Sequence, residues 1–170
     1  SLPNREVTSA LGEIIKYGAI LDRELFDLIF DNLDDLLDFS NSTLLTEVIG
    51  DCAKLKADIV ADDEREGDKR RILNFGHTIG HALETHFGFD TLRHGEAIAY
   101  GMMAAGKLSV ENAGFKSENY AYLQNTVQRL PLPKLPDFNP EEILAIMQND
   151  KKVQSGNLHF ILLEDIGSAV

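Results

Sequence analysis

The segment Asn74-Phe75-Gly76-His77-Thr78-Ile79-Gly80-His81 contains two histidines four residues apart, each directly preceded by a glycine. On a helix, residues at i and i+4 lie on one face, so both imidazole rings would point to the same side. Histidine is the commonest neutral metal ligand, and the pair therefore predicts a metal site, with a structural or surface pair as the alternative. Gly76 and Gly80 favour the metal site, because glycine in a helix costs about 1 kcal/mol relative to alanine and indicates the close approach of another element or a substrate.

Two further residues could complete such a site. His94 stands directly before a segment of small residues, namely Ala97, Ala99, Gly101, Ala104, Ala105 and Gly106. A helix of this composition packs closely against its neighbours, so His94 could face the same cavity as His77; the alternative is a surface histidine at a helix N-terminus. Glu13 would complete a set of two histidines and one carboxylate with an open coordination position, as catalytic metal sites require. The alternative is that Glu13 and Lys16 form an i,i+3 ion pair at the surface.

Charged residues precede the histidine segment, and they are Lys56, Glu66, Lys69, Arg70 and Arg71. Arg70 lies four residues before Asn74 and seven before His77, so an unbroken helix would place all three on one face. In a chain of net charge −12 this group is a candidate anion pocket, with a solvated charged surface as the alternative. A basic pair, Lys151-Lys152, ends the last predicted helix, where cations also suit the helix dipole.

The spacing of Leu, Ile and Val predicts helix through most of the chain, because these residues recur every three or four positions. The predicted helices span residues 6–17, 22–37, 43–61, 69–86, 96–113, 117–130 and 139–150. Residues 131–136 contain three prolines and predict an extended connector. Residues 158–163 are the one strong strand candidate. Residues 1–170 are therefore expected to form one mainly α domain, without the glycine-rich loop and alternating strands of a dinucleotide-binding fold.

Composition limits the classes of function. A length of 170 residues, with 44% hydrophobic and 26% charged residues, is average for one soluble globular domain. The net charge of −12 argues against a nucleic-acid partner, because phosphate binding needs clustered Lys and Arg. No apolar run approaches the roughly 20 residues needed to span a bilayer, and the first residues show no signal-peptide pattern. Cys52 is the only cysteine, so no intrachain disulfide can form, which fits a reducing cytoplasm.

Taken together, these motifs resemble the core signature of the 3-dehydroquinate synthases. The resemblance is carried by residues 2–6, 13–18, 56–57, 66–67, 70, 73–84, 94–102 and 150–152. They follow the family's order at close to its spacing and span nearly the whole chain, and the combination is highly specific. The family more often has alanine where this chain has Gly12, which is a small departure.

The resemblance implies the mainly helical C-terminal domain of the family, without the N-terminal domain that binds NAD. It implies that the ligands of a divalent metal ion, zinc or cobalt, are Glu13, His77 and His94. It implies that the substrate is contacted by Lys16, Lys56, Arg70, Asn74 and one lysine of the Lys151-Lys152 pair. Proton-transfer roles are implied for His81 and Glu66, so the two histidines of the pair are expected to have separate roles.

The implied reaction converts 3-deoxy-D-arabino-heptulosonate 7-phosphate into 3-dehydroquinate and phosphate, a lyase step of the shikimate pathway towards chorismate and the aromatic amino acids. We expect the full enzyme to be a cytoplasmic homodimer that uses NAD, and we expect the isolated chain to lack synthase activity. The alternatives are another sugar-phosphate cyclase such as a 2-deoxy-scyllo-inosose synthase, a metal-dependent polyol dehydrogenase, and a non-catalytic helical module that binds metal. His81 and the surroundings of Asn74 favour the dehydroquinate enzyme.

Overall fold

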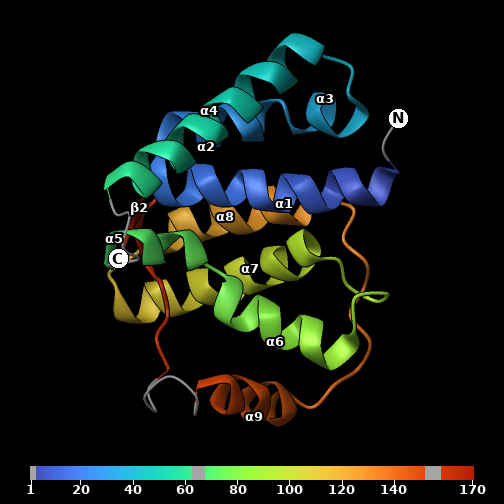
Figure 1. The fold of residues 1–170 in the computed structure, drawn as a ribbon, viewed down its shortest axis with the longest axis vertical. Coiled ribbons are helices and arrows are strands. Elements are labelled where there is room, and N and C mark those ends of the chain that lie inside the picture. The colour runs from blue at the N-terminus through green and yellow to red at the C-terminus, as the bar shows by residue number, and fades with distance from the viewer. Residues whose placement is uncertain (1–2, 63–67, 152–157) are drawn as a thin grey trace.

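The computed structural model describes residues 3–62, 68–151 and 158–170, and most of this part is helical (Figure 1). The helices are α1 (Asn4–Leu21), α2 (Arg23–Asp31), α3 (Leu33–Asp38), α4 (Ser42–Asp62), α5 (Asp68–Arg71), α6 (His77–Phe87), α7 (His94–Asn112), α8 (Ser117–Gln128) and α9 (Pro140–Lys151), with a 3₁₀ turn, η1 (Ile72–Asn74). None of the described helices is long and apolar enough to cross a membrane. The predicted mainly α fold is confirmed.

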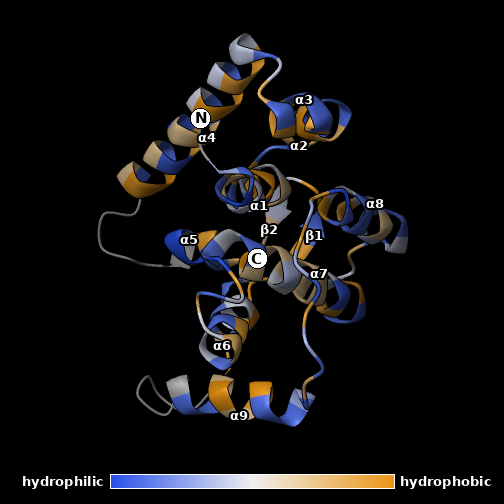
Figure 2. Cartoon of the chain, turned by 90° about the vertical axis from the view of Figure 1, so that its right-hand side faces the viewer, coloured by the Kyte–Doolittle hydropathy of each residue, from blue (hydrophilic) through white to orange (hydrophobic). Residues whose placement is uncertain are grey.

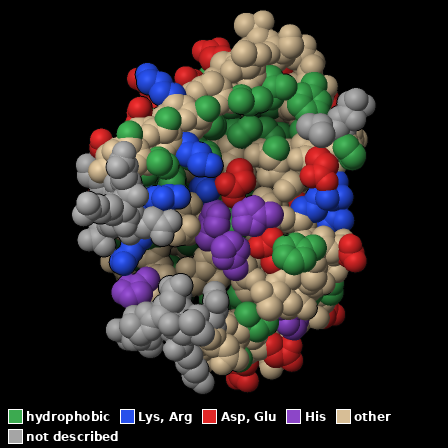
Figure 3. Space-filling model, in the orientation of Figure 1, with side chains coloured by type: hydrophobic (Ala, Val, Ile, Leu, Met, Phe, Trp, Pro, Cys, Tyr) green, Lys and Arg blue, Asp and Glu red, His purple; other side chains and the backbone are tan. Residues whose placement is uncertain are grey.

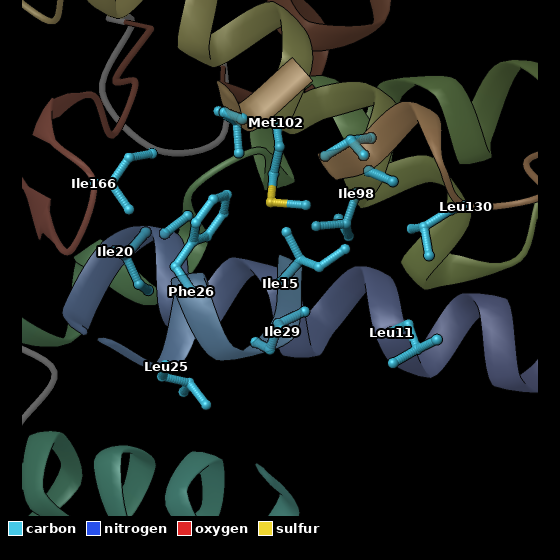
Figure 4. Packing of buried hydrophobic residues seen from close by; sticks show 14 of the residues in the cluster. Leu11, Ile15, Ile20, Leu25, Phe26, Ile29, Ile98, Met102, Leu130 and Ile166 are labelled. Atoms are coloured by element: carbon cyan, nitrogen blue, oxygen red, sulfur yellow. The ribbon is translucent and has the colours of Figure 1, made fainter. Parts of the chain in front are cut away.

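Helix α1 lies at the centre of the fold, with α2 and α4 on one side and α7 and α8 on the other (Figure 1). Its apolar side chains face the core, and Ile15 is fully buried. Figure 4 shows Ile15 lying close to Ile98 and Met102 of α7, both of which are also fully buried. Burial of a side chain of this size contributes about 1.5–3 kcal/mol, so this layer fixes α1 against α7.

A second, smaller apolar cluster joins α6 and α7 to α9. Ile143 and Met147 of α9 pack with Ala82 and Leu83 of α6 and with Ala97 of α7. Figures 1 and 2 both show α6 between α9 and the rest of the molecule. Helix α9 is therefore attached mainly through α6, the helix that carries the paired histidines.

The predicted helix over residues 22–37 is in fact two helices that meet at Asn32. This residue has a φ of −120°, and its side-chain amide donates to the carbonyl oxygen of Leu28 at 2.9 Å. Asparagine side chains compete in this way with backbone hydrogen bonds, so α2 ends and α3 begins there.

The strand prediction was correct only at its last residue. Strand β1 (Leu163–Asp165) pairs antiparallel with β2 (Ser168–Ala169), and residues 158–162 precede it. The hairpin turns at Gly167, whose φ is +86°. The backbone N–H of Gly167 donates to the carbonyl oxygen of Ala19 at 2.8 Å, which attaches the hairpin to α1.

The predicted helix over residues 69–86 is interrupted directly before His77. Turn η1 ends at Asn74, and Gly76 has a φ of +77°, a left-handed conformation that glycine adopts far more readily than other residues. The expectation that Arg70, Asn74 and His77 share one helical face was therefore wrong, because the chain changes direction between Asn74 and His77.

The close approach predicted from Gly76 and Gly80 is confirmed, and the approaching element is α7. A Cβ atom added to Gly101 of α7 would lie 2.0 Å from the backbone oxygen of Gly76. Helix α1 meets α7 in the same manner, because a Cβ atom on Gly12 would lie 2.3 Å from the backbone oxygen of Gly95. The segments that carry the three candidate metal ligands are thus in backbone contact next to each ligand.

We expect the substitution Gly12→Ala to lower the free energy of unfolding. Alanine gains about 1 kcal/mol in helix propensity, but overpacking costs typically 1–3 kcal/mol or more. The contact at 2.3 Å is with the backbone of Gly95 and cannot be relieved by a side-chain rotation, so the overpacking cost outweighs the gain. Gly50 of α4 is the matched control, since a Cβ atom there meets nothing within 4 Å and Gly50→Ala should stabilise the protein. Urea unfolding followed by circular dichroism measures both, and equal stabilities of the two variants would contradict the expectation.

Candidate metal centre

Three helices bring Glu13, His77 and His94 together. Glu13 lies in the middle of α1, whereas His77 and His94 are the first residues of α6 and α7. Oε1 of Glu13 lies 3.7 Å from Nε2 of His77 and 3.5 Å from Nε2 of His94. Figure 3 shows a group of histidine side chains at the middle of one face of the molecule, with basic side chains beside it. The structure therefore places the three predicted ligands at one point on an accessible face.

The Nδ1 atoms of His77 and His94 face away from this point and are hydrogen-bonded. Nδ1 of His77 lies 3.1 Å from the backbone carbonyl oxygen of Phe75, and Nδ1 of His94 lies 3.2 Å from both carboxylate oxygens of Glu84. Carbonyl and ionised carboxylate oxygens only accept hydrogen bonds, so Nδ1 carries the proton in each ring. In the neutral form of each ring Nε2 therefore keeps a lone pair, and Nε2 is the ring nitrogen that faces Glu13.

The protonation states also suit metal ligation. Burial lowers the pKa of His77 to about 4, and the charge of Lys16 acts in the same direction, so the ring is neutral at pH 7. Burial raises the pKa of Glu13, but the charge and hydrogen bond of Lys16, 2.7 Å from Oε2, outweigh it and leave the pKa below its usual value. With the His94 ring in its neutral form, the centre presents two imidazole lone pairs and one carboxylate.

The surroundings of Oε1 of Glu13 indicate whether a metal ion fits the centre. It is buried, and within the described part of the chain no group donates a hydrogen bond to it. Its lone pairs and those of the two Nε2 atoms converge with no proton between them, an arrangement that repels itself unless a cation lies there. Two ligand atoms bound tetrahedrally to zinc at 2.0–2.1 Å are about 3.3 Å apart. The observed 3.5 and 3.7 Å are close to this value, so the donor set fits a divalent metal ion.

His81 lies beside this set and is more exposed than His77. Its ring is 5.2 Å from the ring of His77 and 5.6 Å from that of His94, and donor atoms of the three histidines lie within 4.8 Å of one another. A cavity of about 360 Å³ adjoins His81, and its lining includes Thr78 and Thr85 of α6 and Ile146, Met147 and Asn149 of α9. His81 thus lies between the candidate metal position and a space large enough for a small molecule.

The other predicted site residues are less closely grouped. Lys16 is only 4% exposed and contacts Glu13, which excludes the alternative of a surface ion pair. Lys56 of α4 is exposed; burial lowers the pKa of Lys16, and the charge of Lys56 acts in the same direction. Asn74 is exposed at the end of η1, and Arg70 of α5 is half-buried.

Glu66 and Lys152, which were predicted to transfer protons and bind substrate, lie outside the described residues. Lys151 ends α9, but its side chain also lies outside the described part. Their predicted roles remain predictions.

The structure adds one carboxylate that the sequence analysis did not assign to the site. Glu84 of α6 is buried and lies against His94, although ten residues separate the two in the chain. The helical spacing from His77 and His81 was the available signal. It could not show that the partner of Glu84 is on another helix.

Comparison with known proteins identifies relatives along nearly the whole chain. The family model for the C-terminal part of 3-dehydroquinate synthase matches residues 10–153. Among curated relatives, the 3-dehydroquinate synthase of Geotalea uraniireducens (strain Rf4) is 44% identical over 170 residues, which are 99% of this chain and 47% of the relative. That of Prochlorococcus marinus (strain AS9601) is 39% identical over 171 residues, with 99% and 47% coverage. The chain thus spans about half the length of these relatives.

Solved structures with the same fold include two synthases. One is a 2-epi-5-epi-valiolone synthase from Streptomyces hygroscopicus subsp. jinggangensis 5008 with NAD⁺ and Zn²⁺ bound, at a TM-score of 0.87 and 25% identity. The other is a 2-deoxy-scyllo-inosose synthase complexed with carbaglucose-6-phosphate, NAD⁺ and Co²⁺, at a TM-score of 0.80 and 28% identity. Each match covers 100% of this chain and 48% of the solved chain.

Proposed function

Because the chain belongs to the 3-dehydroquinate synthase family, we propose that it forms the metal- and substrate-binding domain of an enzyme that makes 3-dehydroquinate and phosphate from 3-deoxy-D-arabino-heptulosonate 7-phosphate. The observation that carries the proposal is the buried Oε1 atom of Glu13, which has no donor in the described part of the chain and faces two imidazole lone pairs. NAD⁺ would be held mainly by the part of the relatives that this chain does not span. The reaction would belong to the shikimate pathway in the cytoplasm, and the full enzyme would be a homodimer.

In this proposal Glu13, His77 and His94 hold Zn²⁺ or Co²⁺. When bound, the ion supplies Lewis acidity to a substrate oxygen. Lys16 holds the second carboxylate oxygen of Glu13 at 2.7 Å and so keeps Oε1 aimed at the two histidines.

His81 is exposed at the edge of the 360 Å³ cavity, so its imidazole can exchange protons with a molecule bound there. The substrate anions are assigned to Lys16, Lys56, Arg70 and Asn74 and to one lysine of the Lys151-Lys152 pair. Glu66 is assigned to proton transfer with His81.

Another sugar-phosphate cyclase is the second candidate, because the two solved structures described above are named as a 2-epi-5-epi-valiolone synthase and a 2-deoxy-scyllo-inosose synthase. Sequence identity separates the two candidate functions. It is 39–44% with the 3-dehydroquinate synthases and 25–28% with the two solved synthases. Because relatives of higher sequence identity are the better guide to the substrate, we prefer the dehydroquinate synthase activity.

A chimera tests this function. Residues 1–170 replace the matching 47% of the Geotalea uraniireducens synthase, and phosphate release and 3-dehydroquinate formation are measured with NAD⁺ and Zn²⁺. We expect turnover by the chimera and none by the isolated chain. His77→Ala in the chimera should lower turnover at least about 100-fold, since a Lewis-acid metal supplies several kcal/mol and each 1.36 kcal/mol is tenfold in rate.

The other outcomes discriminate the alternatives. A chimera that binds NAD⁺ and Zn²⁺ but turns over only a hexose 6-phosphate would favour another cyclase. One that turns over neither substrate would favour a non-catalytic metal-binding module. Turnover by residues 1–170 alone would contradict the proposal that NAD⁺ is held mainly by the part of the relatives that this chain does not span.

A further inference from the structure

We propose that Glu84 is a positioning residue of the metal centre: its carboxylate holds His94 as the Nδ1–H tautomer and aims the Nε2 lone pair at the ion. This inference rests on the metal site proposed above.

The contact between Glu84 and His94 joins α6 and α7, two of the helices that carry candidate ligands. Glu84 lies on α6, seven residues after His77, and its side chain is 7% exposed. Both of its carboxylate oxygens lie 3.2 Å from Nδ1 of His94, the first residue of α7. The backbone contact between Gly76 and Gly101 fixes the distance between these helices. The position of His94 is therefore set by α6 as well as by its own helix.

Burial makes this hydrogen bond hard to replace. A buried carboxylate that lacks a partner costs several kcal/mol, so Glu84 requires a donor. Within residues 3–62, 68–151 and 158–170, His94 is the side-chain partner that the structure gives it. The other tautomer of His94 would place a lone pair against the carboxylate and a proton towards Glu13, which would block metal ligation. Glu84 thus selects the ligating tautomer.

The two candidate histidine ligands differ in the group that accepts their Nδ1 hydrogen bond. His77 donates to a neutral backbone carbonyl, whereas His94 donates to a carboxylate. A carboxylate partner raises the basicity of the other ring nitrogen, so Nε2 of His94 becomes the stronger donor to the ion. Loss of such a partner typically costs 10–100-fold in metal affinity.

The test uses the chain itself and Zn²⁺, with affinity measured by competition against a chromophoric chelator. Glu84→Ala should weaken zinc binding about 10–100-fold, and Glu84→Gln, which keeps a hydrogen-bond acceptor but no charge, should weaken it less. The control is Glu142→Gln, because Glu142 of α9 likewise places a carboxylate against a histidine, lying 3.6 Å from Nδ1 of His86 at the far end of α6. This control should bind zinc like the unaltered chain. Urea unfolding of each variant checks that the fold is retained.

Two further readouts separate positioning from a general structural role. Nitrogen-15 NMR of the histidine rings in the metal-free chain should show His94 protonated at Nδ1, and a mixture of tautomers in Glu84→Ala. In a His94→Ala background, Glu84→Ala should have no further effect on zinc affinity, because its only route to the ion has been removed.

Unchanged affinity and tautomer in Glu84→Ala would overturn the proposal while leaving the metal site intact. An equal loss of affinity in the presence and absence of His94 would also overturn it. If the unaltered chain bound no Zn²⁺ at all, the metal site itself would fail, and the role of Glu84 with it.

Discussion

Replacing His77 with alanine should reduce bound zinc from about one ion per chain to nearly none. His77 is 14% exposed and supplies one of the three donor atoms that converge on the centre. Loss of a hydrogen bond to a ligand alone costs about 10–100-fold in affinity, so loss of the ligand should cost more than about 100-fold. Elemental analysis after dialysis against submicromolar zinc measures the stoichiometry. Unchanged stoichiometry would count directly against the assignment.

The same substitution should abolish stabilisation by the metal. An ion that binds only the folded chain stabilises it by about 4 kcal/mol at a concentration 1,000-fold above its dissociation constant. The melting temperature of the unaltered chain should therefore rise with zinc, whereas that of His77→Ala should not. His86→Ala is the control, because His86 lies on the same helix but pairs with Glu142. Its response to zinc should match that of the unaltered chain, and a loss of response in both variants would point to a general effect of shortening α6 side chains.

Part of this centre could be predicted from the sequence without three-dimensional information. Two histidines and a carboxylate in glycine-rich segments are typical of a catalytic metal site. In the structure Oε1 of Glu13 lies 3.7 Å from Nε2 of His77 and 3.5 Å from Nε2 of His94. What the sequence pattern could not show is how the three helices meet. That depends on backbone contacts at Gly12 and Gly95, where alanine would collide, and a glycine in a sequence does not reveal its neighbour on another helix.

The incorrect predictions have local physical causes. A shared face for Arg70, Asn74 and His77 assumed an unbroken helix, but Gly76 adopts a φ of +77° and redirects the chain. The spacing of apolar residues cannot reveal this change of direction, because glycine adopts both helical and left-handed conformations. Likewise, the spacing of Glu13 and Lys16 is the same for a surface pair and a buried one. Only the packing of α1 against its neighbours decides that Lys16 is buried.

Replacing Glu96 with alanine should cost about 1.5–3 kcal/mol of the free energy of unfolding, the range for losing hydrogen bonds to a charged group, because the Arg5 side chain is 37% exposed and water can solvate the guanidinium that remains. Glu96 is 0% exposed and accepts from Nε and Nη2 of Arg5, each at 2.8 Å, and from the backbone N–H of Arg93 at 2.8 Å. Its loss would leave the Arg5 guanidinium without its anion and the start of α7 without its cap. Urea unfolding of the chain in a chelator measures the change without a contribution from metal.

The matched control on the same helix is Glu111→Ala. Glu111 forms an exposed pair with Lys107 at 3.6 Å, with both side chains more than half exposed, and such pairs contribute at most about 1 kcal/mol. A loss for Glu96→Ala no larger than for Glu111→Ala would contradict the expectation.

The double variant Arg5→Ala, Glu96→Ala separates charge burial from lost packing. Because removing both partners leaves no uncompensated charge, it should be less destabilised than the sum of the single variants. Additive losses would mean that Glu96 acts on α7 alone, through the N–H of Arg93. A strong coupling would mean that the pair joins the start of α1 to the start of α7. In that case Glu96→Ala should also weaken zinc binding, since His94 begins the helix that Arg5 and Glu96 hold in place.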